Sequence, residues 1–160
     1  MWKQTDRSKL RVASFNELDA LVGKHITKVS PKIFWEEQHA SFRFESLQEA
    51  EDALSDPYFL PFLPDQETRA ASFVEVREFP SYSLEISEAL KVVERLTGDG
   101  EALQIRCENR HWVAAFGDET PVSANSAAIA ICLAGLSAKG IHVDFVPGWT
   151  AGSARSCAAA

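Results

Sequence analysis

Two adjacent carboxylates, Asp118 and Glu119, stand in the stretch FGDETPVSANS, between an aromatic-rich segment and a long apolar one. Carboxylates can bind a cation or act as a general acid and base. Neighbours in sequence rarely converge on one ligand, however, and no histidine or third acid lies at a suitable spacing. We therefore favour a simpler interpretation, in which this stretch is a solvated turn that leads the chain to the cap of the next helix.

The sequence SANSAA at 123–128 would place free N–H groups at a helix start, where an anion can bind. Arg106 or His111 would add a positive charge if the hairpin that holds them lies beside this start. The same small residues also make an ordinary N-cap, and this interpretation is favoured. The residues that a ligand site in this region would use are Tyr82, Ser83, Arg106, His111, Trp112, Ser123, Asn125 and Ser126.

Other catalytic and metal-binding patterns do not occur in the sequence. The four histidines are far apart, and there is no H-x-x-x-H, P-loop, G-x-S-x-G or G-x-G-x-x-G pattern. Successive cysteines, Cys107, Cys132 and Cys157, are too far apart for a zinc knuckle, and their odd number indicates reduced thiols. We expect no metal, no cofactor and no catalytic residue among the common types.

Charge and length limit the kind of partner. The chain has 160 residues, which fits one domain, and a net charge of −7 from 16 basic and 23 acidic residues. Phosphate neutralisation supplies most of the affinity for nucleic acid, so duplex DNA or RNA is disfavoured as a partner. No apolar stretch has membrane-spanning length, and the charged N-terminus predicts no secretory signal. The predicted partners are a second copy of the chain or a small anionic ligand, in the cytoplasm of the cell or of a phage's host.

Capping boxes and apolar stripes predict the first two helices. One box is Ser14 with Glu17, and the helix that it opens covers about 15–24. The second box opens a helix at about 47–55, which Pro57 ends.

Two later helices have longer apolar stripes. Ser83 is predicted to cap a helix at about 86–96, which stops at Gly98. Ser126 or Ser123 is predicted to cap the last helix. The predicted buried face of that helix is Ile129, Cys132, Leu133 and Leu136.

Alternating apolar residues predict the strands. Residues 32–45 are expected to form two strands around the polar loop EEQH, and 72–79 a further strand. Residues 101–118 predict a hairpin with its turn near 108–110, and its nearly all-apolar second strand is expected at the centre of a sheet. GIHVDFV, at 140–146, adds an edge strand.

Hairpins force antiparallel pairing, so this order of elements predicts an α+β fold and not a doubly wound nucleotide-binding sheet. The predicted organisation is a loose leader at 1–13, one domain at 14–146 with an enlarged insert at 27–75, and a flexible tail at 147–160. A group of aromatic residues either lines a pocket or interface or forms a second small core, and both interpretations stay open. They are Phe34, Trp35, Phe42, Phe44, Tyr58, Phe59, Phe62 and Tyr82.

Several of these stretches together resemble the phage ABA sandwich domain family, small phage and prophage proteins whose function is not established. The match covers about 80–140, with a thinner match at 14–24. The residues that carry it are Glu17, Leu18, Leu21, Val22, Pro80, Tyr82, Ser83, Val92 to Leu96, Trp112, Phe116, Gly117, Asp118, Ser123, Ala124, Ser126, Ala127, Ala130 to Ala134, Leu136, Ala138 and Gly140.

The chain departs from the family pattern at two helix starts. Glu85 stands where an Asp is expected, and Ala128 stands where a Pro is expected. The resemblance implies a three-layer α/β/α sandwich around an antiparallel sheet and a phage-like origin. It transfers no catalytic residue.

Three hypotheses about function follow. The first, which we prefer, is a non-enzymatic phage or prophage accessory protein that acts by binding, with a homo-oligomer as one form. The second is a counter-defence protein that sequesters a small nucleotide-like immune signal at the helix start described above. The third is an enzyme with a carboxylate site around Asp118, Glu119 and Asp144, which requires these side chains to converge in a cleft.

Overall fold

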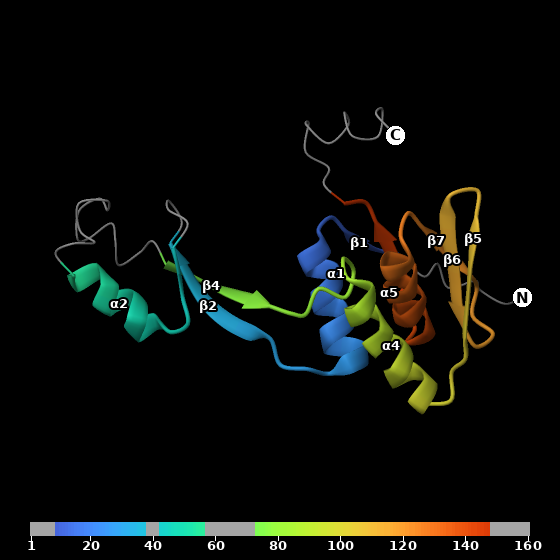
Figure 1. Cartoon of the computed structure of the whole chain (residues 1–160), viewed down its shortest axis with the longest axis horizontal. Helices are drawn as coiled ribbons and strands as arrows, with labels where there is room; N and C mark the ends of the chain where they lie inside the picture. The colour runs from blue at the N-terminus through green and yellow to red at the C-terminus, as the bar shows by residue number, and fades with distance from the viewer. Residues whose placement is uncertain (1–8, 38–41, 57–72, 148–160) are drawn as a thin grey trace, which may run out of the picture. The chain divides into compact units, whose positions relative to one another are not determined.

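The computed structural model describes residues 9–37, 42–56 and 73–147, and the chain forms two compact units. The first unit is made of Met1–Ser30 and Phe79–Ala160, and the second of Pro31–Glu78 (Figure 1). Of the predicted tail at 147–160, only Pro147 lies within the described residues, and the predicted leader is described from Lys9 onward.

The described part of the first unit has four helical segments: α1 (Phe15–Val22), the π-helix η1 (Gly23–Thr27), α4 (Ile86–Gly98) and α5 (Ala127–Ala138). Ser14 caps α1, because its Oγ accepts a hydrogen bond from the backbone N–H of Glu17. Ser126 caps α5 in the same way, through the N–H of Ile129, and so decides between the two predicted caps.

The predicted cap of α4 is wrong. Its N-cap is Glu85, which makes no capping hydrogen bond through its side chain. Ser83 lies two residues earlier, and its hydroxyl donates instead to the carboxylate of Asp19 at 2.7 Å. A capping serine accepts an N–H with its hydroxyl oxygen, whereas here the Ser83 hydroxyl donates to a charged carboxylate, and hydrogen bonds to charged groups are stronger than neutral ones.

The hairpin prediction is confirmed. Strands β5 (Leu103–Glu108) and β6 (His111–Phe116) pair in antiparallel register around a two-residue turn. Asn109 and Arg110 in this turn have φ values of 49° and 66°, as a type I′ turn requires. The sheet order is β5-β6-β7, so β6 is central as expected.

The stretch FGDETPVSANS is not wholly a loop, because it contains strand β7 (Val122–Ala124). β7 pairs antiparallel with β6, so that Trp112 lies opposite Ala124 and Ala114 opposite Val122. Three residues are too few for an alternating pattern to stand out from the flanking polar residues, and sequence reasoning missed this strand.

The loose leader is also wrong in its last residues. Leu10–Val12 form β1, which pairs in parallel with β8 (Val143–Phe145). The strand expected within 140–146 is therefore present, but its partner comes from the other end of the chain. Val12 is buried, and the ring of Phe15 packs edge-on against Phe145 at 5.4 Å between centroids.

Helix α5 is the centre of the first unit. It packs against β6 and β7 on one side and against α4 and α1 on another (Figure 1). A helix that is covered on several sides is expected to be apolar all round. In α5 every residue is buried or half-buried, which agrees with this expectation. The predicted buried face was therefore too narrow: Cys132 and Leu136 are fully buried, but so are Ala130 and Ala134.

Gly135 allows α5 and α4 to approach closely. A Cβ at this position would lie 2.9 Å from Cδ1 of Ile26, 3.0 Å from Cγ1 of Val92 and 3.2 Å from Cδ1 of Leu96. All three neighbours are fully buried. The small residue is thus a packing requirement at the contact between α5 and its helical neighbours.

The second unit has the strands β2 (Lys32–Glu37), β3 (Arg43–Phe44) and β4 (Phe73–Glu78) and the helix α2 (Leu47–Ser55). The sheet order is β3-β2-β4, with antiparallel pairs throughout. The helix prediction at 47–55 is confirmed, and Ser46 caps α2. The EEQH loop prediction is wrong for Glu36 and Glu37, which belong to β2.

Aromatic residues of the second unit contact one another and a cation. The rings of Phe44 and Phe73 meet edge to face at 5.9 Å, and the guanidinium of Arg43 lies 4.2 Å from the centroid of Phe34. Arg43 also forms an ion pair with Glu78. Three of the predicted aromatic residues, Tyr58, Phe59 and Phe62, lie outside the described residues.

The fold class is thus α+β, with two antiparallel three-stranded sheets and one parallel strand pair among the described residues.

Candidate functional site

Three of the predicted ligand residues lie on one face of the sheet β5-β6-β7. Arg106 is opposite Val113, which is opposite Ser123, and His111 is two residues from Val113 on the same strand. Side chains two apart on a strand share a face, so Arg106, His111 and Ser123 project together, away from α5. We call this the outer face of the sheet.

The guanidinium of Arg106 is already engaged on this face. Its Nε donates to the Glu108 carboxylate at 2.6 Å, and both side chains are more than half exposed. The carboxylate offsets the positive charge that an anion would need. The arrangement therefore gives little electrostatic support for an anion site at Arg106.

The outer face has a shallow hollow of about 70 Å³, lined by Gln104, Ile105, Arg106, Val113, Ala114, Ala115 and Pro121. Sites for small molecules and cofactors typically have volumes of about 300–1,000 Å³. The hollow can accept a small side chain or a few waters, but not a nucleotide. Its size gives the second hypothesis no support.

The structure separates the remaining predicted residues from this face. Trp112 projects to the opposite face of the sheet and packs against the core. Asn125 and Ser126 stand at the start of α5, where Ser126 is occupied in capping. Tyr82 and Ser83 are buried in the turn before α4, with 1% of their surface exposed.

A buried carboxylate, Asp19, is the polar feature that sequence reasoning missed. It accepts a hydrogen bond from the backbone N–H of Ser83 at 2.8 Å and another from the Ser83 hydroxyl at 2.7 Å. Burial raises the pKa of Asp19 above its ordinary value, although both hydrogen bonds from Ser83 oppose this rise. The only sequence signal was an acid within an apolar helix face, next to Leu18.

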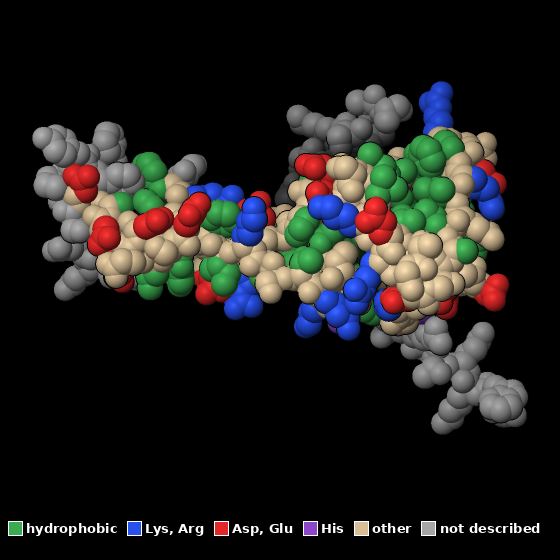
Figure 2. All heavy atoms as spheres, turned by 60° about the horizontal axis from the view of Figure 1, so that its bottom comes forward, with side chains coloured by type: hydrophobic (Ala, Val, Ile, Leu, Met, Phe, Trp, Pro, Cys, Tyr) green, Lys and Arg blue, Asp and Glu red, His purple; other side chains and the backbone are tan. Residues whose placement is uncertain are grey.

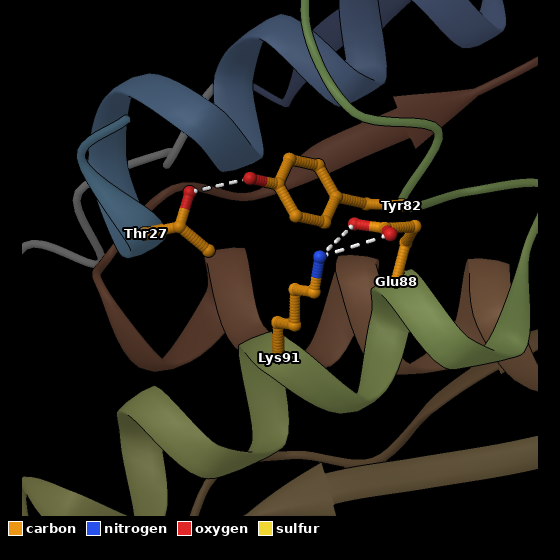
Figure 3. Close-up of polar contacts among 4 residues, drawn as sticks. All are labelled: Thr27, Tyr82, Glu88 and Lys91. Atoms are coloured by element: carbon orange, nitrogen blue, oxygen red, sulfur yellow. Dashed lines mark hydrogen bonds and ion pairs between the residues drawn. The ribbon is translucent and has the colours of Figure 1, made fainter. Parts of the chain in front are cut away.

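Beside it, the Tyr82 side chain lies between η1 and α4 (Figure 3). Its hydroxyl is 2.8 Å from Oγ1 of Thr27, and between the ring and α4 the Lys91 ammonium binds the Glu88 carboxylate at 2.8 Å. Burial raises the pKa of Tyr82, so its hydroxyl stays protonated. The Tyr82–Thr27 contact attaches the turn at 80–84 to η1, and the Ser83–Asp19 contact attaches it to α1, so both have a structural role.

The carboxylates of the third hypothesis do not make a site. Asp118, Glu119 and Asp144 are all exposed. No group of three metal-ligating side chains converges anywhere in 9–37, 42–56 or 73–147. The convergence in a cleft that this hypothesis required is not observed.

The two described cysteines differ in environment. Cys132 is fully buried in α5, and burial raises the pKa of its thiol well above its ordinary value. Cys107 is exposed on β5. Cys107 is thus the more accessible of these two thiols.

The start of α4 exposes three large aliphatic side chains. Leu84 is 61% exposed, Ile86 50% and Leu90 48%. Ile86 and Leu90 are one helical turn apart and share a face beside the buried stripe of Ala89, Val92 and Leu96. We call Leu84, Ile86 and Leu90 the α4 apolar surface; Figure 2 shows that hydrophobic side chains reach the surface of each unit among separated charged ones.

Comparison with protein-family models, with curated proteins and with solved structures finds no match for this chain. None of the helices in the described part of the chain is both long and apolar enough to cross a membrane.

Proposed function

We propose that the protein is a non-enzymatic accessory protein of a phage or prophage that acts by binding, with self-association as one mode. The support for the phage origin is the motif resemblance over 80–140. Under this proposal the protein works in the cytoplasm of the host cell.

The observation that carries the binding function is the α4 apolar surface. Fully burying a Leu or Ile side chain stabilises a protein or complex by about 1.5–3 kcal/mol. Because the three side chains are about half exposed, a covering surface would gain about 3 kcal/mol from them. Exposed apolar patches that polar residues surround mark protein–protein contacts, and the α4 apolar surface supports the proposal on this ground.

We further propose the α/β/α sandwich that the resemblance implies. Helix α5 covers one face of the sheet β5-β6-β7. A second helical layer would lie over the outer face, which carries Arg106 and Ser123.

The test is co-purification with a matched pair of variants. The full chain, Ile86→Gln/Leu90→Gln and Lys91→Gln/Arg95→Gln are each tagged and expressed in host cells that carry the gene. Lys91 and Arg95 are also exposed on α4 but are polar and lie on another face, so the second variant controls for changes to that helix. Equal folding of all three is checked by circular dichroism.

We expect the full chain and the polar control to retain the same protein in a fixed ratio, and the apolar variant to lose it. Equal recovery by all three variants, or no protein in a fixed ratio, would contradict a binding function at this surface.

A further inference from the structure

The edge of strand β5 has no partner strand among the described residues. In the order β5-β6-β7, one side of β5 pairs with β6 and the other side is an edge. Five of its six residues are exposed, and the register with β6 is continuous, without a bulge. Proteins usually protect such an edge with proline, a bulge or charged side chains, especially lysine. Strand β5 (LQIRCE) has no proline, lysine or bulge, and its charged residues are Arg106 and Glu108.

The turn geometry shows which backbone groups point to this edge. In a two-residue hairpin the residues that flank the turn, Glu108 and His111, form a hydrogen-bonded pair. Pairing alternates along the strand, and the N–H of Gly117 indeed donates to the carbonyl of Ala102 at 2.9 Å. The even-numbered residues therefore bond to β6, while the N–H and C=O groups of Leu103, Ile105 and Cys107 point outward.

We propose that the end of β5 pairs in antiparallel register with the end of β5 of a second copy, centred on Cys107, so that residues 106–108 of each copy face residues 108–106 of the other. The turn at Asn109 and Arg110 ends β5 at this point, so Cys107 is the outward-facing residue that hydrogen-bonds across the contact. This inference rests on the proposed function, of which self-association is one mode, and it gives that mode a contact separate from the α4 apolar surface. A two-fold axis at Cys107 makes the contact identical for both copies.

Charge complementarity favours this partner and this register. On the outer face, Arg106 and Glu108 are separated by one residue, so an antiparallel copy centred on Cys107 places Arg106 opposite Glu108 of the partner, twice. Opposite charges in directly facing positions stabilise a sheet, whereas like charges destabilise it. The register centred on Ile105 would instead place Arg106 opposite Gln104 and form neither pair.

The same register brings the two Cys107 residues together. Facing residues in a hydrogen-bonded antiparallel pair have Cα atoms about 5.5 Å apart. This separation lies within the range that a disulfide bridges. In the Ile105-centred register, Cys107 would face Leu103 and the two thiols would not meet.

Disulfide trapping tests the register. The full chain carries Cys157→Ser, so that Cys107 and the buried Cys132 are the remaining thiols. A matched variant adds Cys107→Ser and Ile105→Cys, which moves the exposed thiol by one outward-facing position. Both proteins are oxidised with copper phenanthroline in air, and the covalent dimer is measured on a non-reducing gel.

We expect rapid dimer formation through Cys107 and at least tenfold slower dimer formation in the variant that carries Ile105→Cys, because only the first pair of thiols faces each other. Faster trapping of the variant, or equal trapping of both, overturns the inference.

A charge swap tests the same contact without cysteine chemistry. Arg106→Glu places two acids opposite two acids and should weaken the dimer on the order of tenfold. Adding Glu108→Arg exchanges both charges and should restore the affinity. Sedimentation equilibrium measures the dissociation constants, and circular dichroism confirms that the hairpin is intact.

An unchanged dissociation constant in Arg106→Glu, with a dimer still present, overturns the β5 contact but leaves the binding function in place. Loss of the dimer without rescue by the swap also overturns the charge register. The proposed function is tested separately, because the co-purification experiment changes residues of α4 and not of β5.

Discussion

The Asp19–Ser83 contact offers a prediction that can be worked out in some detail. Replacing Asp19 by Ala leaves two buried donors, the N–H and the hydroxyl of Ser83, without their acceptor. Each unsatisfied buried group costs about 1–3 kcal/mol. Relief of the buried charge offsets part of this cost, so we expect Asp19→Ala to lower the free energy of unfolding by about 2–4 kcal/mol.

Two variants separate the hydrogen bonds from the charge. Ser83→Ala loses only the hydroxyl donor and should cost about 1–2 kcal/mol. Asp19→Asn keeps an acceptor oxygen and removes the buried charge, so it should stay within about 1 kcal/mol of the wild type at pH 7. Urea unfolding followed by circular dichroism measures the order.

The pH dependence has a definite sign. The folded-state pKa of Asp19 lies above its ordinary value, so the folded protein binds a proton more readily than the unfolded chain does. The ionised form therefore reduces stability at neutral pH. This loss disappears as the pH falls through the folded-state pKa, and it is absent below the unfolded-state pKa.

The Asn side chain of Asp19→Asn does not titrate. The other carboxylates are present in both proteins, so their contributions to the pH dependence of stability cancel when the two proteins are compared. The stability of the wild type relative to Asp19→Asn should therefore rise between pH 7 and about pH 4. If the wild type instead lost stability relative to Asp19→Asn on acidification, the ionised carboxylate would be the favoured form and our account of the contact would be refuted.

Two further predictions concern packing and capping. Gly135→Ala should lower the free energy of unfolding by about 1–3 kcal/mol despite the better helix propensity of Ala, because the neighbours of its Cβ are fully buried. Gly98→Ala is the control: its Cβ would meet no neighbour, so it should be neutral or slightly stabilising. Equal effects of the two substitutions in thermal unfolding would contradict this prediction. Ser126→Ala removes the cap of α5 and should lower the free energy of unfolding in urea by about 1 kcal/mol. Ser123 is exposed on β7, so Ser123→Ala should change this free energy by less than about 0.5 kcal/mol. The reverse order would mean that the cap is misassigned.

The sequence was informative where a local signal decides the structure. Ser14 and Ser46 cap α1 and α2 as predicted, because a hydroxyl three residues before a helical N–H acts within one turn. The turn at Asn109 and the central position of β6 were likewise predictable from local pattern and apolar composition.

The failures come from contacts between distant parts of the chain. Ser83 looked like a cap, but its partner Asp19 is 64 residues away, and no local pattern reveals that pairing. Leu10–Val12 became a strand only because β8, at the other end of the chain, supplies its partner. Of the predicted ligand residues, the alternation of strands β5 and β6 could place Arg106 and His111 on one face, whereas the burial of Tyr82 depends on η1.

The central claim is that this protein works by binding, and a second copy is the partner for which the structure offers a defined contact. Size-exclusion chromatography with light scattering, over a range of concentrations, tests it most directly. We predict a mass that rises above the 17.7 kDa of one chain towards twice that value. A mass of 17.7 kDa at every concentration, up to the limit of solubility, would contradict the self-association that the account predicts.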